Sequence, residues 1–146
     1  KLLERTGTSE AGAITAIYTV LVEGDDMNEP VADAVRGFLD GHIVLSRKLA
    51  NANHFPAVDV LRSVSRLDRA VCKENEIALI SEARDLLSVY MQNEDLINVG
   101  AYLKNSNPKI DRAIEKFAHI ENFLRQKYDQ LSARQEAFDL LFKILK

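Results

Sequence analysis

The stretch VEGDDMNEPVADAVRGFLDGHIVLSR, Val22–Arg47, contains a turn, a helix and a strand in succession. Its first residues are acidic and turn-forming up to Pro30, whose fixed φ suits the first turn of a helix. Apolar residues then recur at helical spacing through Leu39, and Gly41 follows the last of them. The short apolar run His42–Leu45 comes next and predicts a strand. This order of elements indicates an α/β domain.

The residues on either side of this stretch extend the α/β pattern. Ala13–Val22 (AITAIYTVLV) is rich in β-branched and aromatic residues and is uncharged, which is typical of a strand buried on both faces of a parallel sheet. Arg47–Ala52 has a helical pattern, and Pro56 interrupts the chain before the apolar segment Val58–Leu61. Residues 1–70 are therefore predicted to form the edge of a parallel sheet with its helices.

From residue 71 onward the pattern is helical. One apolar stripe at helical spacing contains Ile77, Ile80, Ala83, Leu87 and Met91, with Glu76, Glu82, Arg84 and Asp85 largely off it. Asn107 and Pro108 predict the N-cap and first residue of another helix. The inner face of that helix would hold Ile110, Ile114 and Phe117, and the pattern leaves open whether the helix continues through Leu124. Ser132 and Gln135 have capping-box spacing before a last helix. We expect two units, 1–70 and an all-α unit, 71–146.

Composition excludes several classes of protein. Of the 146 residues, 47% are hydrophobic and 28% are charged, which is typical of a globular chain. The net charge of −3 argues against a general nucleic-acid binder. No apolar run is long enough to span a membrane, and the first residues lack a signal peptide's apolar segment. Cys72 is the only cysteine, which allows no internal disulfide and fits a reducing cytosol. Because the chain starts with Lys1, we expect a piece of a longer protein.

Judged residue by residue, the chemistry is sparse. Asp25, Asp26 and Glu29 cluster in one loop, but they lack the ligand spacing of a calcium-binding loop. A solvated acidic loop is favoured, and a contact loop for a basic partner is the alternative. The three histidines have no metal-ligand spacing, so no metal site is predicted. No Gly-x-x-x-x-Gly-Lys-Ser/Thr loop occurs, so the isolated chain is expected to bind no cofactor and to hydrolyse no nucleotide.

Four segments carry a resemblance to a known family. They are Val22–Arg47, HFPAVDVLRSVSR (His54–Arg66), EDLINVGAY (Glu94–Tyr102) and NPKIDRAI (Asn107–Ile114). In this order they resemble the flagellum-specific ATPase of the type III export family, which is related to the catalytic subunits of rotary ATP synthases. The resemblance implies the end of a RecA-like P-loop NTPase domain, followed by an all-α C-terminal helical domain. It also implies a homo-hexamer around a central channel, with ATP and Mg²⁺ used by the full-length protein.

The resemblance assigns roles to particular residues. Arg66 matches the arginine finger, which would act in trans on a neighbouring subunit's ATP; the alternative is an arginine that only caps a turn. Phe55 matches the position, often tyrosine, that packs on the adenine base; the alternative is a core aromatic beside Pro56. Tyr102 would lie near the same pocket. The loop with Asp25, Asp26 and Glu29 would face the central channel and contact a stalk protein.

The implied function is that of an ATP hydrolase which couples hydrolysis to the unfolding and export of flagellar substrates. Its implied partners are a central stalk protein, a regulatory stator-like subunit, export chaperone–substrate complexes and the export gate at the inner membrane. It would be cytoplasmic and peripheral to that membrane at the flagellar or secretion base. The alternatives are a virulence type III secretion ATPase, a subunit of a rotary ATP synthase, and a non-catalytic helical module that binds chaperone–substrate complexes.

Overall fold

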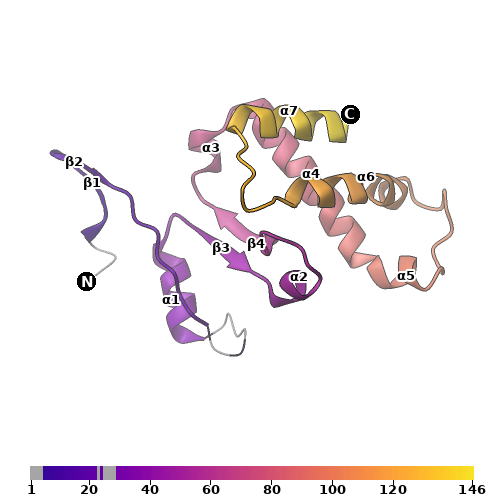
Figure 1. The fold of residues 1–146 in the computed structure, drawn as a ribbon, viewed down its shortest axis with the longest axis horizontal. Coiled ribbons are helices and arrows are strands. Elements are labelled where there is room, and N and C mark those ends of the chain that lie inside the picture. Colours follow the sequence, from indigo (N-terminus) through magenta and orange to yellow (C-terminus); the bar gives the residue numbers. More distant parts are fainter. Residues whose placement is uncertain (1–4, 23, 25–28) are drawn as a thin grey trace. The chain divides into compact units, whose positions relative to one another are not determined.

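The computed structural model describes residues 5–22, 24 and 29–146. The chain divides into two compact units, Lys1–His42 and Ile43–Lys146. Figure 1 shows the strands and short helices of the first half and the longer helices α4, α6 and α7 of the second. The mixture of short strands with a helical C-terminal part confirms the predicted α/β class with an all-α end. No helix in the described part of the chain is long and apolar enough to cross a membrane.

The first unit contains a small hairpin and one helix. Strands β1 (Gly7–Ser9) and β2 (Gly12–Ile14) pair antiparallel, with Gly7 opposite Ile14. Helix α1 (Pro30–Phe38) begins at the predicted proline, and its Ala32 is buried.

The prediction of a buried strand of a parallel sheet over Ala13–Val22 is wrong: β2 ends at Ile14, is exposed along its length and pairs antiparallel. Residues 15–22 have no strand structure, and Ile17 and Leu21 are 95% and 92% exposed. A strand buried on both faces needs hydrogen-bonding neighbours and covering helices. Among the described residues only β1 pairs with this segment, and that pairing ends at Ile14. The apolar pattern is therefore present without the sheet that would bury it.

A second two-stranded sheet pairs β3 (Gly41–Leu45) with β4 (Val58–Ser65). Between them lies α2 (Arg47–Asn51), whose N-cap Ser46 accepts a hydrogen bond from the backbone N–H of Leu49 at 3.3 Å. The strand and helix predicted at these positions are confirmed. The described strands form two separate pairs, and no longer sheet is built from them.

The helical part contains α3 (Asp68–Val71), α4 (Glu74–Gln92), α5 (Glu94–Asn98), α6 (Pro108–Leu124) and α7 (Arg134–Leu145). Helices α4, α6 and α7 contribute every residue of the main core cluster: Ala83, Leu86, Leu87, Ala113, Ile120, Leu141 and Leu145. The rings of Tyr90 and Phe117 stack with centroids 3.6 Å apart. Helix α6 begins at the predicted Pro108 and runs unbroken to Leu124, which answers the question that the pattern left open.

Two details of the helical prediction need correction. Glu76, placed largely off the apolar stripe, is only 3% exposed, because an arginine from a distant helix neutralises it. The last helix is capped one residue later than predicted: the backbone N–H of Ala133 donates to Glu136 at 3.3 Å, while Gln135 bonds Asp139 instead. Capping-box spacing identified the start of this helix but not the residues that form the cap.

Candidate functional site

Phe55 lies in a short loop between α2 and β4 that is closed at both ends by backbone hydrogen bonds. The N–H of His54 donates to the carbonyl of Leu49 at 2.9 Å, and the N–H of Ser46 donates to the carbonyl of Ala57 at 2.8 Å. The Phe55 side chain is 51% exposed. Half of the ring is therefore available to a ligand, which disfavours the alternative of a core aromatic.

The C-terminal end of α6 holds this loop from the other side. The backbone N–H of Gln126 donates to the carbonyl of Phe55 at 2.8 Å. Arg125 donates through Nη1 to the carbonyl of Asn53 at 2.9 Å and through Nη2 to Glu121 at 2.8 Å. Asn53 has a φ of 55°, a left-handed conformation that asparagine tolerates better than most residues. Loop and helix are thus joined over a long separation in the sequence.

Arg66 lies at the far end of β4, directly after the strand. The N–H of Leu67 donates to the Ser65 hydroxyl at 3.3 Å, so Ser65 closes the turn that contains Arg66. Arg66 is exposed, and α3 begins two residues later. An exposed guanidinium at the end of a strand can approach an anion on another molecule, and its planar fork suits phosphoryl oxygens.

The strand before Arg66 is attached to the helical core by one arginine. From α4, Arg84 donates through Nη1 to the carbonyl of Val60, through Nη2 to that of Leu61 at 3.0 Å, and through Nη1 to that of Ser63 at 3.3 Å. The sequence gives no local signal for this role, because more than twenty residues separate Arg84 from each acceptor. Arg84 therefore fixes the strand that carries Arg66.

The structure does not bring Tyr102 to the Phe55 loop. The Tyr102 hydroxyl donates to the carbonyl of Asn107 at 3.0 Å and accepts from the Asn107 N–H at 3.2 Å, so it lies at the N-terminus of α6. Phe55 contacts the other end of that helix through Gln126. At 1.5 Å per residue, α6 separates the two ends by about 25 Å. The two residues therefore contact opposite ends of α6, and a place for Tyr102 near the nucleotide pocket stays a prediction.

The acidic loop is described only in part. Asp25 and Asp26 lie outside the described residues. Glu29 is the N-cap of α1, and its carbonyl accepts a hydrogen bond from the Asp33 N–H at 2.9 Å. Over the described residues, no group of three or more His, Cys, Asp or Glu side chains could hold a metal ion.

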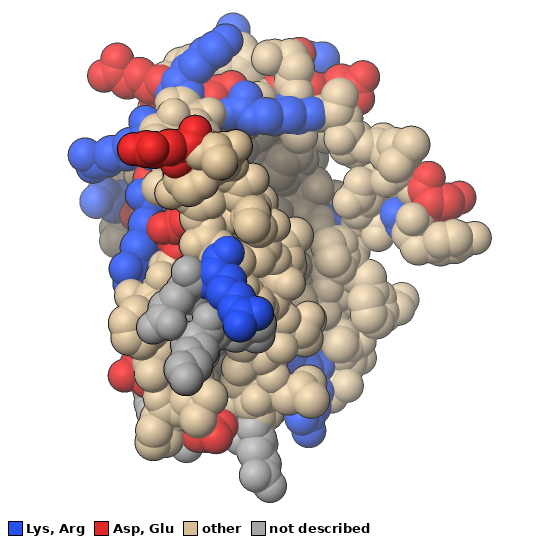
Figure 2. Space-filling model, turned by 90° about the vertical axis from the view of Figure 1, so that its left-hand side faces the viewer, with Lys and Arg blue, Asp and Glu red and all other residues tan. Residues whose placement is uncertain are grey.

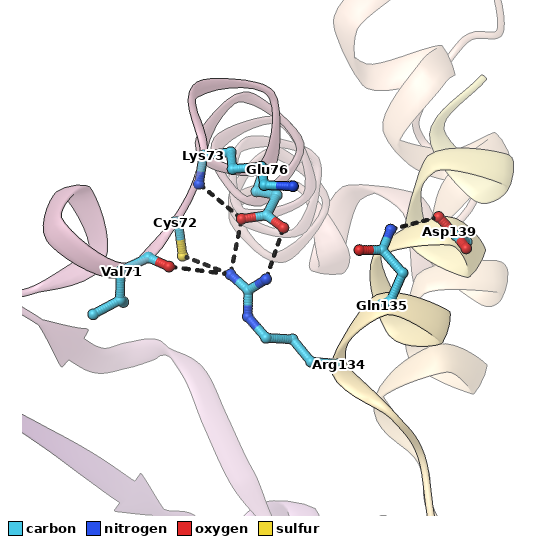
Figure 3. A network of polar contacts seen from close by, with 7 residues as sticks. All are labelled: Val71, Cys72, Lys73, Glu76, Arg134, Gln135 and Asp139. Atoms are coloured by element: carbon cyan, nitrogen blue, oxygen red, sulfur yellow. Dashed lines mark hydrogen bonds and ion pairs between the residues drawn. The ribbon is translucent and has the colours of Figure 1, made fainter.

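An ion pair between buried Glu76 and half-exposed Arg134 joins α7 to the start of α4, and Figure 3 shows its contacts. Arg134 donates from both terminal nitrogens to the two carboxylate oxygens of Glu76, each at 2.8 Å, and to the carbonyl of Val71 at 3.3 Å. The N–H of Lys73 donates to the same carboxylate at 2.7 Å. The bonds from Arg134, followed by the bond from Lys73, lower the pKa of Glu76 to about 2. This cluster joins α7 to the start of α4.

Charge on the surface is mixed. Figure 2 shows acidic and basic side chains interspersed on the described part of the face in view, with uncharged residues between them. A basic stripe of the kind that tracks a nucleic-acid backbone is not seen on this part of that face.

Comparisons with known proteins divide the chain near the end of β4. Residues 1–65 match the profile of the ATP synthase alpha/beta family, nucleotide-binding domain, and residues 72–143 match the T3SS EscN ATPase C-terminal domain. A flagellum-specific ATP synthase of Bacillus subtilis is 51% identical over 97% of this chain and 32% of its own length. A SPI-2 type 3 secretion system ATPase of Salmonella typhimurium is 48% identical over 99% of this chain and 34% of its own length.

A solved structure of a type III secretion ATPase has a fold similar to that of this chain. The assembled ATPase EscN from the type III secretion system of enteropathogenic E. coli superposes with a TM-score of 0.95 and 42% identity, over 99% of this chain and 35% of that one. The chain spans about a third of the length of the curated relatives that it matches.

Proposed function

Since this chain belongs to the family of flagellum-specific and type III secretion ATPases, we propose that it is the C-terminal part of a protein-export ATPase. It contributes Phe55, which packs on the base of the nucleotide bound by its own subunit, and Arg66, which acts on the nucleotide of a neighbouring subunit. The phosphate-binding loop and the catalytic carboxylate lie in the rest of the longer protein. The domain boundary that we propose lies between residues 70 and 71.

The observation that carries this proposal is the placement of Phe55 and Arg66 at opposite ends of β4. Phe55 lies three residues before the strand, and Arg66 follows its last residue. Eight residues of strand separate them by about 20 Å or more. This separation supports a role for each side chain at a different nucleotide, with Phe55 serving its own subunit and Arg66 the neighbour.

Each residue has a definite chemical task. A flat aromatic face stacks on a nucleotide base, which contributes about 1–3 kcal/mol at comparable sites. The phosphoryl group in transit carries charge on its equatorial oxygens, and a guanidinium from the next subunit stabilises that charge. In the full-length protein, ATP supplies the phosphoryl group and Mg²⁺ neutralises part of its charge.

We propose flagellar export as the process served, with virulence secretion as the second candidate. The flagellar relative is 51% identical and the virulence relative 48%, so the identities support both processes with little difference between them. The known structure of EscN in complex with its central stalk EscO supports a stalk partner for this protein, contacted by the loop with Asp25, Asp26 and Glu29. Further proposed partners are a stator-like subunit, chaperone–substrate complexes and the export gate. The protein would be cytoplasmic and peripheral to the inner membrane.

The test uses the full-length ATPase with Arg66→Ala, and Arg69→Ala as an exposed arginine nearby for control. We expect Arg66→Ala to reduce kcat about a thousandfold while ATP still binds, and Arg69→Ala to leave kcat unchanged. Mixing Arg66→Ala subunits with subunits whose phosphate-loop lysine is replaced should restore part of the activity, because one interface then has both intact halves. Unchanged turnover in Arg66→Ala would refute the finger, and failure of mixed rings to regain activity would refute its action in trans.

A further inference from the structure

Three consecutive residues of the Phe55 loop are each contacted by one end of α6. Arg125 bonds the carbonyl of Asn53 at 2.9 Å, and the backbone N–H of Gln126 bonds the carbonyl of Phe55 at 2.8 Å. The residue between them, His54, faces the same helix end through its ring. Glu121 in the last turn of α6, together with Arg125 and Gln126 directly after it, therefore contacts the loop at every residue from 53 to 55.

The middle contact pairs a buried histidine with a partly exposed carboxylate. His54 is 4% exposed, and its Nδ1 lies 3.8 Å from Oε1 of Glu121 with no hydrogen-bond partner. The same carboxylate oxygen accepts from Nη2 of Arg125 at 2.8 Å. Glu121 thus lies between the imidazole and the guanidinium and holds the arginine in the orientation that reaches Asn53. A carboxylate oriented in this way restricts both neighbours.

These contacts add to the bonds that hold the loop of Phe55. On its other side the loop is held by backbone bonds from Asn53 to Ala50 and from His54 to Leu49, and neither of these bonds reaches Phe55 itself. Arg125 and Glu121 take no part in the main helical core, which consists of apolar residues of α4, α6 and α7. Removing either side chain loosens the loop and leaves that core intact.

We propose that Arg125 and Glu121 are positioning residues for Phe55, and that they set how tightly the protein holds the base of its nucleotide. This inference rests on the proposed role of Phe55 in base packing. The helical C-terminal part therefore contributes to nucleotide affinity without touching the nucleotide, through the loop that it holds. Neither residue takes part in the hydrolysis chemistry.

The experiment compares two ligands in the full-length ATPase: ATP, which has a base, and inorganic tripolyphosphate, which has none. The variants are Phe55→Ala, Arg125→Ala, Glu121→Gln and the double variant of Phe55 and Arg125, with Arg112→Ala as control because Arg112 pairs with Glu82 in another part of the helical unit. We expect Phe55→Ala to weaken ATP binding about tenfold and Arg125→Ala about three- to tenfold, with tripolyphosphate binding unchanged in both. KM for ATP should rise by the same factors while kcat stays within about twofold.

The double variant separates positioning from a general structural effect. If Arg125 acts through Phe55, Arg125→Ala adds no further loss of ATP affinity once Phe55 is alanine. Arg125→Lys should recover part of the affinity, because an ammonium can reach one of the two acceptors but not both. Glu121→Gln should weaken ATP binding by a smaller factor than Arg125→Ala does, with tripolyphosphate binding unchanged.

Each outcome has a clear reading. Equal loss of ATP and tripolyphosphate affinity in Arg125→Ala, or additive losses in the double variant, would overturn the inference. An effect of Phe55→Ala without any effect of Arg125→Ala would also overturn it and leave the proposed function intact. If Phe55→Ala itself leaves ATP affinity unchanged, the base-packing role falls and the positioning role falls with it.

Discussion

Replacing Arg84 with alanine removes the three hydrogen bonds through which α4 holds β4. The acceptors are the carbonyls of Val60, Leu61 and Ser63, all in half-buried residues. A hydrogen bond to a charged group contributes about 1.5–3 kcal/mol net. Because one guanidinium makes all three and water reaches the carbonyls in part, the contributions do not add in full. We expect the free energy of unfolding to fall by about 2–4 kcal/mol, and the melting temperature by about 10–20 °C for a unit of this size.

The assay is urea denaturation of the purified chain, followed by circular dichroism. Arg69→Ala, an exposed arginine in α3, is the control and should change the unfolding free energy by less than about 0.5 kcal/mol. Arg84→Lys should fall between the two, because an ammonium cannot span acceptors along a strand. A loss below about 1 kcal/mol in Arg84→Ala, or a loss equal to that of Arg69→Ala, would refute the view that this arginine anchors the strand.

Three further outcomes are expected. The pKa of Glu76 in the folded chain is about 2, below its ordinary 4.5, so the ionised carboxylate stabilises the fold fully above about pH 4.5 and this stabilisation is lost as the pH falls toward 2. In urea denaturation at several pH values, Glu76→Gln should make the free energy of unfolding depend less on pH in this range. Ile120 lies in the core and is 1% exposed, so Ile120→Ala should lower the free energy of unfolding by about 2–5 kcal/mol. A smaller loss would mean that the neighbouring side chains close the cavity. Tyr102→Phe should lower the free energy of unfolding by about 1 kcal/mol, because the hydroxyl's bonds to Asn107 are lost. The ATP affinity of the full-length protein should stay unchanged, and weaker ATP binding would indicate that Tyr102 lies near the nucleotide.

The elements that the sequence predicts correctly are those with local signals. Pro30 starts α1, and Asn107 with Pro108 starts α6, because cap and first-turn chemistry act over a few residues. The strand over Ala13–Val22 was misjudged, because an apolar run is buried only where sheet neighbours exist to bury it.

The proposed site residues come from a motif in the sequence, whereas the contacts that hold their loop and strand join distant residues. Phe55 and Arg66 are predicted from one continuous segment, and both are exposed, one on each side of β4. Glu76 gave no sign of burial, because its partner Arg134 is 58 residues away. Arg125 lies 72 residues from the carbonyl that it bonds, so no spacing rule could indicate it.

Strand β4 connects Phe55, which precedes it, to Arg66, which follows it, and so links the two proposed nucleotide contacts mechanically. Arg84 bonds β4 at three carbonyls, so the strand is attached to α4 along part of its length. Under the proposed assignment, a base that shifts against Phe55 in one subunit displaces the guanidinium presented to the next. On this proposal, two neighbouring nucleotide sites of a ring would be coupled through β4, because one strand connects the residue that serves the first site to the residue that serves the second.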